Sequence, residues 1–526
     1  MRKPAGNPSG KLINFGVADF GRLALALGFL VIIYLFMAKN PAGTGVDSTL
    51  LVIAAVIGGY MAMNIGANDV ANNVGPAVGA GALTLLGAIL IAVVFEAGGA
   101  LIAGGDVVKT IKKGIIDPAM IPDTQTFIWV MTAALLSAAV WLNIATYVGA
   151  PVSTTHSIVG GVLGAGIAAG GWGIADWDQV QKIVDSWVIS PAMGGIIAAS
   201  FLMIIKRTVL YKKDMKGAAR IVVPIMMGIM AWAFTTYLIL KGLKKIVAVD
   251  FPMAVGLGFI AAIIVYLAVR MVITKRAERI ENTREGIDRL FLIPLIVGAA
   301  FLSFAHGAND VANAVGPLAA INEAVRGGDI AAKAALPLWV MLIGAVGIAV
   351  GLALYCPKLI KTVGNEITEL DKVRAFCVAL AAAITVIIAS QMGLPVSSTH
   401  IAVGGIFGVG FLREHLNTNY NQKIGKIRIH MRDEEHKDET EIDEFIERFD
   451  AASMREKKEF LDELKEKARS DEVTWWERRR VKKAYKAKLV ERSMLLKIVT
   501  AWVVTVPVAG LMSAAFFFMI RGMLIA

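Results

Sequence analysis

The sequence predicts an all-α polytopic membrane protein with two inverted-topology repeats that contain broken or re-entrant helices. Three observations lead to this prediction: an apolar composition, a series of apolar runs of bilayer-spanning length, and two motifs that each occur twice. Of 526 residues, 56% are hydrophobic and 18% are charged, and the mean hydropathy is +0.64. A soluble protein of this length would need more polar surface than this composition supplies.

The apolar runs approach the length of about 20 residues that a membrane-spanning helix needs. They lie at about 20–38, 50–65, 82–102, 127–148, 152–170, 187–206, 220–241, 251–273, 291–306, 335–355, 373–392, 396–412 and 495–520. Some contain Gly, Pro or polar residues, so we expect half-helices among about 12–13 membrane segments. No small-x-small cleavage pattern follows the first run, which predicts a retained anchor rather than a signal peptide.

The distribution of charge predicts the orientation of the chain. The net charge is +11, and the basic residues gather in KRTVLYKKDMKGAAR (206–220) and RMVITKRAERIENTR (270–284). This pattern is typical of cytoplasmic loops and makes a nucleic-acid partner unnecessary. Counting spans from these loops places the N-terminus and the charged block 413–493 in the cytoplasm. We expect an integral protein of a bacterial or archaeal inner membrane. The only cysteines, Cys356 and Cys377, suggest neither a disulfide framework nor a zinc site.

The predicted organisation has six parts. They are an N-terminal anchor (1–45), repeat 1 (46–206), a linking helix pair with basic loops (207–290), repeat 2 (291–412), a charged helical cytoplasmic domain (413–493) and a C-terminal span (494–526). Basic residues at the end of the charged block would contact anionic membrane lipid.

Two motifs define the repeats. GANDVANNVGP (66–76) recurs as GANDVANAVGP (307–317), and APVSTTHSIVGGVLGAG (150–166) is echoed by LPVSSTHIAVGGIFGVG (394–410). The offsets within the two pairs are nearly equal, so whole segments correspond. The span count places the two halves in opposite orientations. Duplicated, inverted halves with broken apolar segments are typical of alternating-access transporters.

The first motif carries acid and amide oxygens within an apolar segment. A spacing of three and four residues would place Asn68, Asp69 and Asn72 on one helical face. A carboxylate with amide oxygens offers hard ligands to Na⁺ or a protonatable group to H⁺. We therefore predict a cation-coupling site, suited to Na⁺, at the repeated residues Asn68, Asp69, Asn309 and Asp310. The asparagines alone would also fit a structural role as hydrogen-bonding partners between helices.

Residues around this motif qualify the prediction. Ala314 stands where the first copy has Asn73, so Asn73 is the least essential of the set. Glu96 is a further intramembrane acid, and the matching stretch WVMLIGAVGIAVG contains none. We expect Glu96 to serve coupling, although it could also simply pair with a neighbour. His306 is likewise matched by Ile65. We expect helix interruptions that expose backbone carbonyls at Gly66, Gly75-Pro76, Gly307 and Gly316-Pro317.

The second motif predicts an anion site. Pro151 and Pro395 suit the first position of a helix, and hydroxyl residues follow each of them: Ser153, Thr154, Thr155, Ser397, Ser398 and Thr399. Hydroxyl donors beside the free N–H groups of a helix N-terminus can hold an oxyanion, although capping and packing would explain them as well. His156 and His400 close the clusters as candidate anion donors or proton relays, or as structural hydrogen-bond partners.

Together, the doubled GANDVAN…GP and PVS[TS]TH…GG motifs resemble the inorganic phosphate transporter (PiT) family of cation-coupled phosphate symporters. The resemblance implies phosphate uptake driven by Na⁺ or H⁺, no cofactor other than a coupling ion, and Asn72 and Asn313 beside the hydroxyl clusters at the substrate. Glu96 matches the family's first-half glutamate, whereas the missing second-half partner departs from its sodium-coupled members. The block 413–493 is not part of the core family pattern.

Several alternatives stay open at this point. A sulfate permease of the same fold would use the same hydroxyl clusters, although acceptors such as Asp69 and Asp310 favour phosphate, which retains a proton. A channel would tolerate inverted repeats, but buried acids favour a binding site. An intramembrane hydrolase built on Ser153 or Ser397 lacks the expected GxSxG-type elbow, so we expect no enzyme. A homo-oligomer is compatible with the sequence.

Overall fold

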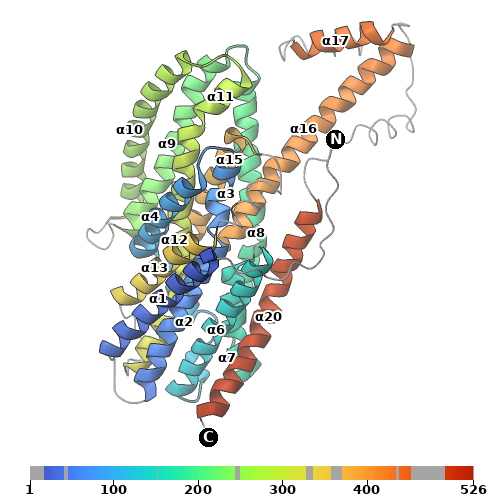
Figure 1. The fold of residues 1–526 in the computed structure, drawn as a ribbon. Helices are drawn as coiled ribbons and strands as arrows, with labels where there is room; N and C mark the ends of the chain where they lie inside the picture. Colours follow the sequence, from blue (N-terminus) through green and yellow to red (C-terminus); the bar gives the residue numbers. More distant parts are fainter. Residues whose placement is uncertain are drawn as a thin grey trace.

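The computed structural model describes most of the chain, with several short gaps and one longer gap. The residues outside the description are 1–16, 41–45, 151, 243–248, 327–335, 357–359, 361–369, 434–437, 452–491 and 525–526. Within the described ranges the chain is helical and contains no β-sheet (Figure 1).

The first part of the chain covers the ranges that were predicted as the anchor, repeat 1 and the linking pair. Its helices are α1 (Val17–Lys39), α2 (Val46–Asn68), α3 (Ala71–Gly79), α4 (Leu85–Ala103), α5 (Gly105–Lys113), α6 (Thr124–Val148), α7 (Thr154–Gly170), α8 (Trp177–Ile205), α9 (Met215–Lys241), α10 (Phe251–Glu278) and α11 (Arg284–Leu290). Helices α9 and α10 pack against each other at the edge of the bundle, and little of α10 is buried.

The second part repeats this pattern. Its helices are α12 (Leu292–Val325), α13 (Leu338–Tyr355), α15 (Lys372–Gln391), α16 (Ser398–Asp433), α17 (Glu439–Ala451) and α20 (Arg492–Leu524). Helix α16 continues without a break from the last motif into the charged block, and Figure 1 shows it leaving the bundle toward α17. The predicted boundary at 412 is therefore not a helix end. Most of the remaining block, 452–491, lies outside the described residues.

The number of membrane segments agrees with the sequence. Among the described residues, 11 helical segments are long and apolar enough to cross a membrane. The two remaining predicted runs are the 17-residue helix α7 and the first part of α16, which begin with the hydroxyl clusters. The molecule is thus an integral membrane protein.

Helix packing follows a two-fold exchange of the repeats. Helix α2 packs on α13 as α12 packs on α4, and α7 packs on α20 as α16 packs on α8. The pairs α2 with α6 and α6 with α7 are matched by α12 with α15 and α15 with α16. A duplicated unit whose halves are intertwined explains this pattern. The opposite orientation of the halves in the membrane stays a prediction.

Glycines make the closest matched contacts between helices. A Cβ at Gly164 would overlap the backbone of Gly510, and a Cβ at Gly408 would overlap the backbone of Gly195. The motif glycines do the same, Gly66 against α13 and Gly307 against the Glu96 backbone. Small residues allow backbones to approach closely in membranes, where dispersion contacts rather than the hydrophobic effect hold helices together.

The helix interruptions expected at the glycines and Gly-Pro pairs are wrong. Helix α2 runs through Gly66 to Asn68, and the break falls at Asp69–Val70. Pro76 lies inside α3, and α12 continues through Gly307 and Gly316-Pro317 to Val325. The physical reason is that these glycines serve packing, while a proline within a packed membrane helix removes only one backbone donor.

The expectation that Pro395 begins a helix is also wrong. Helix α16 begins at Ser398, and the Ser397 hydroxyl accepts a hydrogen bond from the His400 N–H at 3.2 Å. The Pro395 carbonyl instead accepts a hydrogen bond from Trp187 Nε1 at 3.2 Å. Serine capping fixes the helix start because its hydroxyl satisfies an otherwise free N–H. The equivalent Pro151 lies outside the described residues.

Alanine at the packing glycines should destabilise the protein. Gly164→Ala and Gly408→Ala each force a methyl group into the partner helix backbone, and overpacking of this kind costs about 1–3 kcal/mol. We expect each variant to unfold several degrees lower in detergent, as measured by intrinsic fluorescence. Gly28→Ala and Gly256→Ala are matched controls because nothing lies within 4 Å of the added atom. Equal melting temperatures for both pairs would contradict this account of the packing.

Candidate substrate and cation site

The hydroxyl clusters lie at equivalent helix starts. The Ser153 hydroxyl caps α7 by accepting from the His156 N–H at 3.1 Å, as Ser397 does for α16. The hydroxyl oxygens of these two serines therefore accept hydrogen bonds from the backbone. The following hydroxyls, of Thr154, Thr155, Ser398 and Thr399, are buried. Those of Thr154, Ser398 and Thr399 donate to aspartates of the first motif, whereas that of Thr155 donates to the Val396 carbonyl at 3.0 Å.

Asp69 receives donors from both halves of the protein. Its Oδ2 accepts from the Thr154 hydroxyl at 2.7 Å, and its Oδ1 accepts from the Thr399 hydroxyl at 2.9 Å. The break between α2 and α3 falls at this residue, which places the carboxylate between the starts of α7 and α16. Asp69 thus lies where the two repeats meet.

The asparagines Asn72 and Asn313 complete this network by crossing between halves. Asn72 Nδ2 donates to the Thr399 hydroxyl at 2.9 Å, while Asn313 Nδ2 lies 3.1 Å from the Thr154 hydroxyl and 3.2 Å from that of Thr155. The Oδ1 atoms of Asn72 and Asn313 are buried and have no hydrogen-bond partner within the described part of the chain. Two acceptors are therefore available beside the hydroxyl donors.

Asp310 has different partners from its counterpart. Its Oδ2 accepts from the Ser398 hydroxyl at 2.8 Å and lies 2.8 Å from His306 Nε2. The other ring nitrogen of His306, Nδ1, lies 2.6 Å from Glu96 Oε2. Glu96 Oε1 accepts from Asn73 Nδ2 at 2.8 Å. The His306 imidazole therefore lies between two buried carboxylates, and its hydrogen bond is to Glu96.

This arrangement exists in one half of the protein only. The backbone oxygen that faces Gly307 belongs to Glu96, and the one that faces the equivalent Gly66 belongs to Ile348. Ile348 is therefore the structural counterpart of Glu96, as Ile65 is of His306. The sequence alone predicted no role for His306. Its spacing of four residues from Asp310 nevertheless indicates that the two share one helical face.

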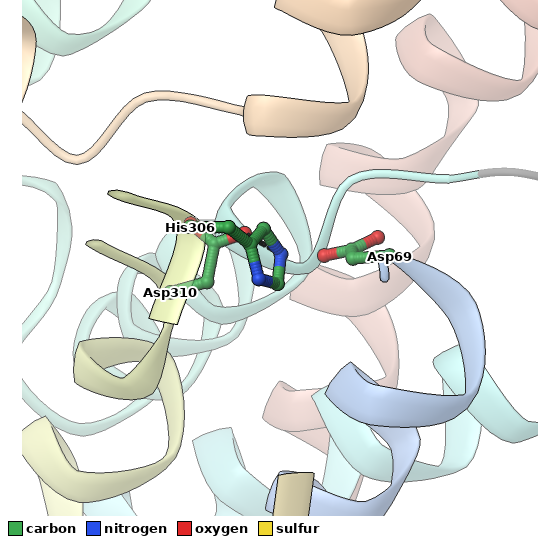
Figure 2. Close-up of side chains that lie close together, drawn as sticks. All are labelled: Asp69, His306 and Asp310. Atoms are coloured by element: carbon green, nitrogen blue, oxygen red, sulfur yellow. Dashed lines mark ion pairs between the residues drawn. The ribbon is translucent and has the colours of Figure 1, made fainter. Parts of the chain in front are cut away.

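The acids and the imidazole form a compact cluster. Asp69, His306 and Asp310 each place one candidate ligand atom within 4.8 Å of the others, and Figure 2 shows the His306 ring between the two aspartates. All three side chains, and Glu96, are at most 1% exposed. Buried carboxylates in a membrane domain need a compensating cation or donors, so the cluster suits a monovalent cation or a proton.

Asn68 and Asn309 face the loops that lead into the hydroxyl helices. Asn68 Nδ2 donates to the Thr146 hydroxyl at 2.9 Å, and Asn68 Oδ1 accepts from the Val152 N–H at 3.2 Å. The Asn309 amide lies 2.9 Å from Ser390 Oγ in the matching position. Thr146 and Ser390 lie near the ends of α6 and α15, and Val152 lies in the segment before α7. Asn68 and Asn309 thus contact the elements that precede α7 and α16.

His156 and His400 meet at the contact between the halves. Their rings are 4.4 Å apart and nearly perpendicular, and each ring also contacts a tryptophan, Trp187 for His156 at 3.8 Å and Trp502 for His400 at 3.6 Å. All four imidazole nitrogens are buried without a hydrogen-bond partner among the described residues. The observed geometry therefore joins the two histidines to aromatic rings.

Comparisons with known proteins point to one family. A family model described as "Phosphate transporter family" matches residues 65–513 of this chain. A protein of Helicobacter pylori (strain J99) with the provisional name phosphate permease is 52% identical over 510 residues, covering 95% of both chains. A provisionally named phosphate permease of Pyrococcus furiosus is 41% identical over 364 residues, covering 69% of this chain and 88% of its own. A solved structure titled "The sodium-dependent phosphate transporter" is 30% identical, with a TM-score of 0.73 over 90% of this chain and all of that one.

The pairing of the buried Glu96 and His306 side chains can be tested by unfolding. We expect Glu96→Ile to lower the melting temperature strongly, because removing one partner of a buried ion pair costs about 3–5 kcal/mol. The double variant Glu96→Ile/His306→Ile reproduces the residues of the other half, Ile348 and Ile65, and should recover part of that loss. The rest should remain because Asp310 also loses its contact with His306. Thermal unfolding in detergent measures both. A double variant as unstable as the single one would contradict the pairing.

Proposed function

The chain belongs to the phosphate transporter family and is a transporter rather than an enzyme, and we propose that it imports phosphate with a cation, Na⁺ or H⁺, by alternating access. One observation carries this proposal: the threonine hydroxyls that would bind phosphate are hydrogen-bonded to the aspartate that would bind the cation. The proposal places the protein in the inner membrane, with the loops 206–220 and 270–284, the N-terminus and the block 413–493 in the cytoplasm.

The shared hydroxyls suggest how the two substrates are coupled. Thr154 and Thr399 each have one hydroxyl proton, and each directs it to Asp69. A proton or Na⁺ on Asp69 satisfies the carboxylate, so both hydroxyls become available as donors to a phosphate oxygen. Cation binding therefore raises the affinity for phosphate, and by linkage phosphate raises the affinity for the cation.

The acceptors in the site favour phosphate over sulfate. Hydrogen phosphate retains an O–H that must donate, whereas sulfate has none. The Oδ1 atoms of Asn72 and Asn313 provide acceptors next to the donor hydroxyls. A buried acceptor without a donor is costly, so sulfate would bind less well. The sulfate permease is the second candidate because both anions suit the helix N-termini.

The different shapes of the two motif copies support alternating access. The first copy of GANDVAN is broken at Asp69–Val70, while the second lies within the continuous helix α12. Nearly identical sequences therefore adopt two backbone states in one molecule. Inverted repeats that exchange such states would expose the shared site to each side of the membrane in turn.

Separate observations support Na⁺ and H⁺ as the coupling cation. The related solved structure is titled sodium-dependent, and Asp69 and Asp310 offer the oxygen ligands that Na⁺ prefers. The imidazole of His306 between Glu96 and Asp310 offers instead a site for a proton. We therefore propose the same cluster as the coupling site for either ion.

Uptake into proteoliposomes tests the proposed function. Labelled phosphate uptake is measured with an inward Na⁺ gradient and with a pH gradient, each imposed alone. We expect one of the two gradients to drive accumulation, and unlabelled phosphate to compete better than sulfate. Uptake that responds to neither gradient would refute symport, and preferential transport of sulfate would refute the substrate.

The aspartates should be required for coupling. We expect Asp69→Asn and Asp310→Asn each to abolish gradient-driven uptake, because a neutral amide carries no negative charge that Na⁺ or a proton would compensate. Folding is checked by the melting temperature and by monodisperse elution in detergent. Near-normal uptake by both variants would refute the role of this pair.

The shared hydroxyls should set phosphate affinity. We expect Thr154→Val and Thr399→Val each to raise the apparent KM for phosphate about tenfold, since a hydrogen bond to a charged group contributes about 1.5–3 kcal/mol. Thr385→Val is the matched control because its hydroxyl donates to the Ala381 carbonyl within its own helix at 2.8 Å. An unchanged KM in both site variants would contradict the shared-donor mechanism.

A further inference from the structure

A basic hollow lies where α9 begins and the segment after α10 ends. Its lining residues are Lys213, Asp214, Lys216, Gly217, Arg220 and Asn282. Asn282 fixes the hollow, because its Nδ2 donates to the Lys213 carbonyl at 2.7 Å and its Oδ1 accepts from the Lys216 N–H at 3.1 Å. Two loops far apart in the sequence are thus held together around three cationic side chains.

Two acids, Asp214 and Glu278, lie beside the three cations of the hollow. The Asp214 carboxylate accepts from the Gly217 N–H at 2.8 Å and so caps α9. Arg220 has one acidic partner, Glu278, at 3.8 Å, and the Nε of Arg220 is buried with no hydrogen-bond partner in the described ranges. A buried guanidinium N–H without an acceptor is unfavourable. The hollow therefore suits an anion with several oxygen acceptors.

An exposed apolar stripe continues from the hollow along α9. Ile221, Ile225, Ile229 and Trp232 are 36–52% exposed and follow Gly217 at helical spacing, so they share its face. The stripe faces outward beside α10, whose surface is also apolar and exposed. In a membrane protein this surface contacts acyl chains. A free anion would use the cations alone, whereas a lipid would use both the cations and the stripe.

We propose that this hollow binds the phosphate headgroup of an anionic phospholipid, with an acyl chain lying along the α9 stripe. Lys213, Lys216 and Arg220 provide the charge, and they belong to the basic segment 206–220 that predicts a cytoplasmic location, with Lys216 and Arg220 in the first turns of α9. Basic hollows at the cytoplasmic ends of membrane helices bind such headgroups. The site is separate from the buried cluster around Asp69 and serves attachment of lipid rather than transport.

Native mass spectrometry of the full-length protein in detergent tests the proposal. Dioleoyl phosphatidylglycerol is titrated as the anionic probe and dioleoyl phosphatidylcholine as the neutral one. We expect Lys216→Gln/Arg220→Gln to weaken binding of the anionic lipid about tenfold or more, and the control Arg276→Gln/Arg279→Gln to change it by less than about twofold. The controls remove the same charge at the C-terminal end of α10, from residues that do not line the hollow.

A second pair of variants tests the stripe without altering charge. Ile221→Ser/Ile225→Ser should weaken binding of the same lipid, while Ile260→Ser/Ile263→Ser, on the exposed face of α10, should not. Equal binding by the hollow variant and its control would overturn the proposal. Equal binding of the two lipids, or displacement of the anionic lipid by inorganic phosphate alone, would also overturn it.

Discussion

The requirement that buried carboxylates be compensated governs the arrangement of this protein's centre. Asp69, Asp310 and Glu96 are almost completely buried in an apolar bundle, where a charge without partners is costly. Each of them is met by donors that come from distant parts of the chain: hydroxyls at the starts of α7 and α16, the amide of Asn73 and the imidazole of His306. The starts of α7 and α16 must therefore lie beside the first motif, and the packing of the outer helices serves to bring them there.

Close glycine packing makes that meeting of the halves feasible. Gly164 and Gly408 allow α7 and α16 to touch α20 and α8, and the motif glycines allow α2 and α12 to touch α13 and α4. The contacts are matched between halves, so one packing solution is used twice. The ring contacts of His156 and His400 lie where the matched elements come together. A duplicated frame of this kind can bring two copies of a motif to one site without either copy forming a complete site alone.

The sequence predicted the elements of this site more fully than their connections. The doubled motifs identified Asp69, Asp310 and the hydroxyl helices, because polar residues repeated in apolar runs are recognisable from their context. The crossing of Asn72 to Thr399 could not be predicted, since it depends on how the two halves pack. The link from Glu96 to His306 joins residues 210 apart and leaves no periodic signal. The helix break at Asp69 was also beyond prediction, because the second copy has nearly the same sequence and no break.

The place where the symmetry fails is informative about coupling. Packing alone does not require a charged pair at Glu96 and His306, because the same frame carries Ile348 and Ile65 at the equivalent buried positions. The pair instead brings a third carboxylate and an imidazole to Asp310, whereas Asp69 depends on hydroxyls from both halves. The two aspartates therefore differ in environment although they are repeated in sequence. If the hydroxyls around Asp69 link the cation to phosphate, the groups around Asp310 are the ones that can distinguish one cation from another, and the selectivity for Na⁺ or H⁺ is best sought at His306.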